Sequence, residues 1–320
     1  MKQATQYMAN LIFQRKILKN FLLLNLSILG MNLYAYNIPS VNLGSSNILD
    51  GGPIRPHPGF YLFENVNYYY SNKFLDHEGK PLGSIKSPVY DSWSAVTQAA
   101  YQSDTKTLLK GKWGVSASLP LVLASNISRN IFGISSSGAG LGNLFLGAYL
   151  QWDTVMLGDR PFFVHRFEFD VAFPIGKNKE PVQTVNPSSN FIYIDPYWAA
   201  TLYLTKNWGI SWRINYLWCT QDKVNHIRTG DAIHLNYSME YQVYPRLFAA
   251  INGYFLQQLQ CNKFCNVNIP NSKTRIFSVG PGILYFFPEE FTFMAYFYVE
   301  RKVLNSSQGV KAIMRLIKHF

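Results

Sequence analysis

Three polar residues in one stretch are of the types that a hydrolytic site uses. His234, Asn236 and Ser238 lie two residues apart, so an extended strand places all three on one face. Neighbours at this spacing are about 7 Å apart, which is beyond direct hydrogen-bond reach. Lipid hydrolysis would therefore need a further group from a partner strand. The spacing favours the alternative, a ladder of polar side chains that faces water.

The other motifs predict no bound cofactor. Gly138, Gly140 and Gly142 form a glycine series, but it has neither a strand-to-helix context nor the Lys-Ser/Thr pair of a phosphate loop. The six histidines are scattered without metal-ligand spacing. We therefore expect no metal and no cofactor.

The three cysteines fall in or at the ends of two predicted loops. If the chain is exported, oxidation is permitted, and Cys261 and Cys265 are spaced to close a small ring. Cys219 is then left over. We predict a disulfide between Cys261 and Cys265.

The stretch that carries the three polar residues alternates without a break. In Ile233–Tyr244, apolar side chains occupy the odd positions up to Val243, and polar ones occupy the even positions between them. A period of two indicates a strand with one apolar and one polar face. Its length is about that of a tilted strand crossing a bilayer.

About twelve stretches follow this rule, an even number that places both ends of the set on one side. They are Gly59–Tyr70, Tyr90–Gln102, Trp113–Leu121, Leu144–Trp152, Phe163–Phe173, Tyr193–Leu204, Trp208–Trp218, Ile233–Tyr244, Leu247–Leu259, Ile276–Phe287, Phe291–Val299 and Val310–Phe320.

Composition favours a membrane barrel over a soluble domain. Aromatic residues make up 16% of the chain and charged residues only 15%, against about 25% charged residues in ordinary soluble domains. Mean hydropathy is nevertheless only -0.04, as alternating strands produce. No stretch of about twenty apolar residues is present to form a spanning helix. We predict an all-β, transmembrane antiparallel β-barrel of about 12 strands, of the bacterial outer-membrane type.

The N-terminus has the pattern of an export signal. Basic residues precede the apolar run 21–29, and Ala35 offers a cleavage site. A buried amphipathic helix is the alternative interpretation. We therefore divide the chain into a signal peptide at 1–35, an irregular segment at 36–58 that is too short for a plug domain of its own, and the barrel at 59–320. Removing the signal lowers the formal net charge from +11 to about +7, and with no basic stripe among aromatics we expect no nucleic-acid partner.

The predicted connections sort by length. Outer-membrane barrels alternate short periplasmic turns with longer external loops. Most connections after even strands are short, and those after odd strands are longer. The long ones are 72–88, 125–139, 176–189, 220–230 and 260–272. We expect these five to be external; a soluble two-sheet sandwich remains the alternative.

Charged and aromatic residues on the polar faces are candidates for the lumen lining. Two interpretations are open: a salt-bridged network that fills a narrow lumen, or a pore whose charges select solute. In the first, which we favour, Tyr296 and Tyr298 leave room for an apolar solute path. The candidates are Arg166, Glu168, Asp170, Arg213, His234, Glu240, Tyr296, Tyr298 and Arg315.

The chain ends on an aromatic residue that follows a strand. Phe320 is typical of the signal that bacterial barrel-assembly machinery recognises, with Leu316, Met314 and Ala312 on the same face. Lys318 interrupts that face close to the predicted membrane edge, where a lysine can reach the interface.

Several segments resemble a family of outer-membrane proteins linked to the meta pathway of phenol degradation. They include PGFYLFENVNYYYSNKFLDHEGKPL at 58–82, GVSASLPLV at 114–122, DVAFPIGK at 170–177, DPYWAATLYLTKNWGIS at 195–211 and MEYQVYPRLFAAINGYF at 239–255. One departure is Asn143, where the family pattern leads us to expect an acid. The resemblance implies a barrel that passes small hydrophobic or aromatic compounds, and it supplies no catalytic residues.

The leading expectation is therefore a passive outer-membrane channel or uptake protein for such compounds. One alternative is a structural or adhesive barrel that binds partners through its external loops. The other is the lipid-hydrolysing enzyme that His234 and Ser238 would serve. Expected partners are outer-membrane lipid, the assembly machinery and a small hydrophobic or aromatic solute.

Overall fold

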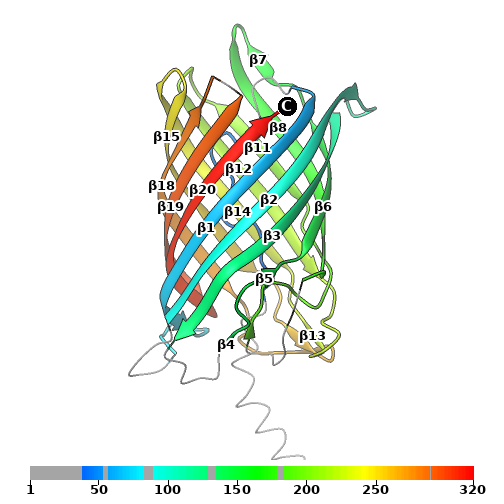
Figure 1. Ribbon diagram of the computed structural model, residues 1–320, viewed down its shortest axis with the longest axis vertical. Helices are drawn as coiled ribbons and strands as arrows, with labels where there is room; N and C mark the ends of the chain where they lie inside the picture. Colours follow the sequence, from blue (N-terminus) through cyan, green and yellow to red (C-terminus); the bar gives the residue numbers. More distant parts are fainter. Residues whose placement is uncertain are drawn as a thin grey trace, which may run out of the picture.

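The computed structural model describes residues 38–52, 57–82, 89–128, 135–176, 178, 184–288 and 290–320. Twelve long strands form a closed wall (Figure 1). They are β1 Gly59–Leu75, β2 Val89–Lys106, β3 Lys112–Ser128, β6 Leu144–Gln151, β8 Arg160–Phe173, β11 Tyr197–Tyr203, β12 Trp208–Cys219, β14 Ala232–Tyr244, β15 Leu247–Gln258, β18 Arg275–Phe286, β19 Phe291–Leu304 and β20 Ser306–His319. The predicted signal peptide lies outside the described residues.

Antiparallel pairing continues around the whole wall. Each of the twelve strands pairs with its neighbours along the chain, and β1 pairs with β20 to close the ring. The last backbone donor, Phe320 N, bonds Phe60 O at 2.9 Å beside this seam. The prediction of a twelve-stranded antiparallel barrel is confirmed.

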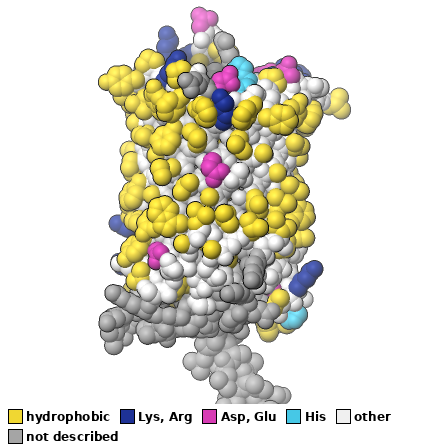
Figure 2. Space-filling view, viewed as in Figure 1, with side chains coloured by type: hydrophobic (Ala, Val, Ile, Leu, Met, Phe, Trp, Pro, Cys, Tyr) yellow, Lys and Arg dark blue, Asp and Glu magenta, His cyan; other side chains and the backbone are white. Residues whose placement is uncertain are grey.

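The predicted alternation places every second side chain of a strand inside the barrel and the others on its outer surface. In β14 the even positions His234 to Glu240 are buried inside the barrel, while Met239 on the outer face is 48% exposed. Figure 2 shows the outer surface as a wide belt of apolar side chains with most charges near its two ends. Such a belt is what a lipid-facing wall requires.

One acidic side chain interrupts the outward apolar face of β1. Glu64 occupies an outward position of β1, between Phe63 and Asn65, which face the lumen. Its carboxylate accepts a 2.6 Å hydrogen bond from Thr97 Oγ1 on β2. Each polar group therefore satisfies the other on the apolar surface.

The predicted sixth strand is interrupted. The stretch 193–204 forms β10 (Tyr193–Ile194) and β11, with Asp195 and Pro196 between them. Proline has no N–H to donate to the ladder. Instead, Pro196 O accepts from Tyr216 N at 3.1 Å, and Asp195 N donates to Asp170 O at 2.9 Å. The break directs the Asp195 side chain into the lumen.

The long connections gather at one end of the barrel, opposite the end where the chain terminates (Figure 1). They carry the short strands β4 (Ser135–Ser136), β5 (Gly140–Leu141), β9 (Thr184–Val185), β13 (Ile227–Arg228), β16 (Lys263–Phe264) and β17 (Val267–Asn268). At the other end the turns are short, except for β7 (Val155–Leu157), which extends β8 beyond the wall. No helix among the described residues is long and apolar enough to cross a membrane.

The irregular segment 38–52 lies inside the barrel. Ile48 is 1% exposed and packs in a cluster with Tyr254, Leu284 and Tyr298 of the inner wall. Nearer the start of the segment, Ile38 and Val41 pack against a second inner cluster that includes Tyr193 and Leu217. The segment therefore forms the core of the barrel, and strands far apart in the sequence pack against it.

Candidate functional site in the barrel lumen

Backbone groups of the inner segment are bonded to side chains of the wall. Gly44 N donates to Asn236 Oδ1 at 2.9 Å, and Gly51 N donates to Thr201 Oγ1 at 3.0 Å. In the reverse sense, Asn47 Nδ2 donates to the carbonyls of Tyr237 and Gly253. A segment without regular structure must satisfy its polar groups in this way when buried.

Asp50 provides the charged anchor of the segment. Its two carboxylate oxygens accept from Arg213 Nε at 2.9 Å and Arg213 Nη2 at 2.7 Å. This bidentate geometry is the strong form of a charge-assisted bond. The Arg213 guanidinium also lies 4.0 Å from the centre of the Tyr197 ring. Arg213 is thus paired with the segment rather than with another strand.

Two carboxylates occupy the space over Gly147. A Cβ at Gly147 would lie 2.2 Å from Asp170 Oδ1 and 2.5 Å from Glu168 Oε1, so only glycine leaves room for both. Glu168 accepts from Ser116 Oγ at 2.6 Å and from the Tyr197 hydroxyl, while Arg166 Nη1 lies 4.0 Å from it. Most of these contacts are hydrogen bonds from neutral hydroxyl groups, and Arg166–Glu168 is the ion pair among them.

The residues considered for lipid hydrolysis lie inside the barrel and are not joined to one another. His234 Nε2 lies 2.8 Å from Asp195 Oδ1, and no hydrogen bond joins His234 to Ser238 within the described part of the chain. Both side chains lie on the inner face and are almost fully buried. They are directed away from the surrounding lipid, so this arrangement does not form a nucleophile and base facing a lipid substrate.

Tyr296 and Tyr298 leave no apolar path beside them. Both point inward, but they are only 2% and 0% exposed because the inner segment covers them. The Tyr298 hydroxyl donates to Gly44 O at 2.7 Å. Glu240 is also enclosed and accepts from Ser211 Oγ at 2.6 Å. The expectation of an open path beside these tyrosines is therefore wrong.

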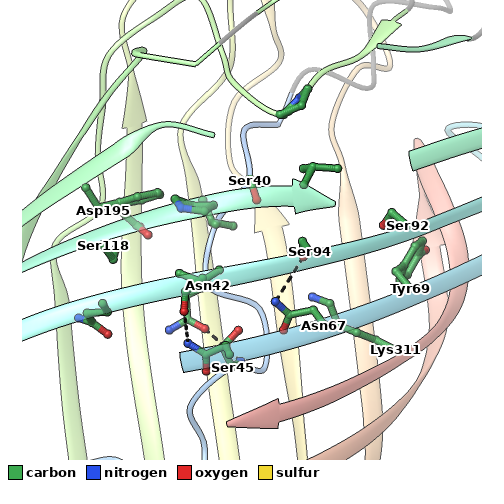
Figure 3. A pocket seen from close by; sticks show the side chains of 18 of the residues that line it. Ser40, Asn42, Ser45, Asn67, Tyr69, Ser92, Ser94, Ser118, Asp195 and Lys311 are labelled. Atoms are coloured by element: carbon green, nitrogen blue, oxygen red, sulfur yellow. Dashed lines mark hydrogen bonds between the residues drawn. The ribbon is translucent and has the colours of Figure 1, made fainter. Parts of the chain in front are cut away.

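Open space lies on the other side of the inner segment. A cavity of about 410 Å³ separates the segment from the inner faces of β1, β2 and β3. Its wall is rich in hydroxyl and amide groups, and Figure 3 shows Asn67 and Ser94 bonded across two strands of it, at 3.3 Å. Its charged lining residues are Glu168, Asp170, Asp195, Arg213, Lys311 and Arg315.

A second cavity of about 270 Å³ adjoins the first. It is lined in part by the β19–β20 turn, including Asn305 and Ser306, at the end that carries the long loops. Residues that line both cavities are Ile38, Ser40, Val41, Tyr69, Tyr90 and Lys311. The two cavities therefore meet at these six residues, beside the inner segment.

The nine residues chosen from the sequence all belong to inward positions, but they separate into two groups. Glu168, Asp170, Arg213 and Arg315 line the larger cavity. The other five are packed in the wall or under the inner segment: Arg166, His234, Glu240, Tyr296 and Tyr298.

The sequence analysis did not identify the polar residues that line the cavity. It also did not identify Asp50, which pairs with Arg213, or Asp195, which lines the cavity. Alternating Ser92, Ser94 and Gln98 already marked β2 as polar on one face. Asp50 lies in a segment without a period, so no pattern pointed to it.

The predicted disulfide is not formed. Cys261 and Cys265 are free thiols, as is Cys219. Strand β16 lies between Cys261 and Cys265, and Cys265 begins a tight turn in which it and Asn266 have φ of 47° and 67°. Extended residues advance about 3.3 Å each, so the intervening strand holds the two thiols apart.

No group of three or more His, Cys, Asp or Glu side chains is placed to hold a metal ion in the described ranges.

The chain is similar to solved structures of bacterial proteins. The COG4313 outer membrane channel from Pseudomonas putida F1 superposes with a TM-score of 0.73 at 12% identity, covering 88% of this chain and 100% of that one. The translocator domain of the autotransporter NalP from Neisseria meningitidis gives a TM-score of 0.48 at 8% identity, covering 83% and 90%. The fold shared with the COG4313 structure is that of a bacterial outer-membrane barrel. No curated protein sequence matches the chain.

A family model described as "Putative MetA-pathway of phenol degradation" matches residues 72–316, a continuous range that runs from the end of β1 through most of β20. The resemblance inferred from short segments is confirmed, and the chain belongs to this family.

Proposed function

We propose that the protein is a passive outer-membrane channel for small molecules of hydrophobic or aromatic character. The observation that carries the proposal is the 410 Å³ cavity between the inner segment and strands β1 to β3. Small-molecule sites commonly enclose about 300–1,000 Å³. The aromatic side chains Tyr69, Tyr90, Phe145 and Tyr197 line this space among hydroxyl groups, a mixture that suits an aromatic ring carrying a polar group.

The inner segment sets the size of the route. It packs against β15, β18 and β19, and the larger cavity lies along the opposite wall. A wide water-filled pore for sugars is therefore not expected. The fold similarity to a structure described as an outer membrane channel is consistent with this reading.

A liposome-swelling panel across sugars, amino acids and aromatic acids tests the proposal. We expect the purified protein to admit aromatic acids and to admit disaccharides poorly. Ser94→Trp places a large side chain in the cavity and should reduce swelling several-fold. Ala95→Trp is the matched control, because the adjacent residue of β2 faces lipid. Equal swelling with Ser94→Trp and the unchanged protein would contradict the assigned route, and no swelling with any solute would contradict the channel.

One observation favours a second function. Two long connections pair to form a small sheet, β13, β16 and β17, at the loop end of the barrel. Its side chains Phe264 and Val267 are 47% and 70% exposed, which suits a surface that binds a macromolecular partner. Deletion of this sheet tests an adhesive role. Loss of binding at the cell surface, with liposome swelling unchanged, would support that role.

A further inference from the structure

Two cations on one strand face the larger cavity without an acidic partner. Lys311 and Arg315 lie four residues apart on the inner face of β20, and both line the cavity. Neither forms a salt bridge with any carboxylate in the described part of the molecule, whereas Arg213 is paired with Asp50. Their charge is therefore not neutralised by direct pairing.

Lys311 keeps donor capacity for a ligand. Its Nζ donates to Leu43 O at 2.9 Å and lies 5.2 Å from the centre of the Tyr254 ring. An ammonium has three N–H donors, so one bonded carbonyl does not exhaust it. Figure 3 shows the Lys311 side chain extending from β20 into the cavity, toward Asn67.

Arg315 also has an unused donor. Its Nη1 donates to Ser45 O at 2.9 Å, and its guanidinium lies 4.9 Å from the centre of the Phe63 ring. The side chain is 9% exposed, and Nε has no partner among the described residues. A buried charged donor left unpaired is costly, and a bound anion would satisfy it.

The nearest acid on the neighbouring strand is already engaged. Glu300 lines the second cavity together with Lys311. Its oxygens accept from the Tyr69 hydroxyl, the Tyr254 hydroxyl and Gly309 N, each at 2.8 Å. These neutral donors hold Glu300 in place, and no salt bridge joins it to Lys311 among the described residues.

The surroundings restrict the kind of anion. The Tyr69 and Tyr90 rings, with centroids 5.6 Å apart, stand beside Lys311 at the junction of the two cavities. They offer apolar contact to a planar ring. Asp170 and Asp195 also line the larger cavity, and like charges repel at short range. A second negative charge on the solute is therefore disfavoured.

We propose that Lys311 and Arg315 form an anion subsite in the lumen and that its ligand is a small aromatic monocarboxylate. This inference rests on the proposed channel function, because the subsite lies on the route assigned to the solute. The solute that binds at this subsite would carry one carboxylate on one aromatic ring.

Equilibrium dialysis of the full chain in detergent tests the subsite. The probes are benzoate, its neutral isostere benzamide and the dianion phthalate. We expect benzoate to bind about tenfold more tightly than benzamide, as a charge-assisted bond implies, and more tightly than phthalate. Lys311→Gln should remove most of the preference for benzoate. Lys318→Gln is the control, since Lys318 has the same charge on the outer face of the same strand.

The comparison of benzoate with benzamide on the unchanged protein needs no variant, so a folding defect cannot obscure it. Equal binding of the two, or an unchanged preference in folded Lys311→Gln, would overturn the subsite. The proposed function fails separately: a protein that binds benzoate but passes no solute in proteoliposomes keeps the subsite and loses the channel. Passage of aromatic acids without any charge preference keeps the channel and loses the subsite.

Discussion

At the scale of single residues, Asp50 decides how firmly the inner segment is held. It is the one charged side chain described in the segment, and both of its oxygens are bonded to Arg213. Removing one partner of an enclosed ion pair leaves the other charge without compensation, which costs about 3–5 kcal/mol in well-buried cases. The lumen also holds open space, so the lower end of that range applies.

Asp50→Asn should therefore lower the free energy of unfolding by about 3 kcal/mol. Urea titration of the protein folded into lipid vesicles measures this change. Asp159→Asn is the control, since Asp159 is an exposed acid in the turn between β7 and β8. Equal stability of the Asp50→Asn variant and the unchanged protein would mean that the ion pair does not anchor the segment.

At the scale of elements, the period of two specified most of the wall. Strands such as β12 and β14 formed where the alternation predicted them, because only one face of each can meet lipid. Two features lay outside that rule. The break at Asp195 and Pro196 arises because proline has no N–H to donate to the ladder, and the outward Glu64 depends on the hydroxyl opposite it.

The pair Glu64 and Thr97 gives a test of the lipid-facing surface. Replacing both with apolar residues, as Glu64→Leu with Thr97→Val, should raise the free energy of unfolding in vesicles by about 1–2 kcal/mol, because acids on a lipid face are destabilising. Thr97→Val alone should lower it, since the carboxylate loses its donor. A double variant that is less stable than the unchanged protein would show that this surface does not face lipid.

At the scale of the whole molecule, the sequence predicted the wall but not its contents. The segment 38–52 has no period, and its contacts join residues such as Gly44 and Tyr298 that are 254 positions apart. No local sequence pattern predicts contacts of this kind. The position of the cavity could therefore be found only in the folded structure. Lys311 alternates with apolar residues in the stretch 310–320, which indicates an inward charge, but the sequence does not show that it lacks a salt-bridge partner among the described residues.

The orientation of the barrel predicts which thiol reacts. Cys265 is exposed in the β16–β17 turn, at the end with the long connections, whereas Cys219 is buried. If that end is external, a membrane-impermeant maleimide should label intact cells, and Cys265→Ser should lose most of the label. Cys219→Ser should keep it. If Cys265 is labelled only after the outer membrane is disrupted, the end with the long connections faces the periplasm, and the assigned orientation is wrong.

The central claim is that small solutes pass between the inner segment and the wall of β1 to β3. Single-channel recording of the purified protein in planar bilayers tests it most directly. We predict small, discrete current steps that Ser94→Trp reduces and Ala95→Trp leaves unchanged. A barrel that inserts and yet stays silent, or currents that Ser94→Trp does not alter, would contradict the claim.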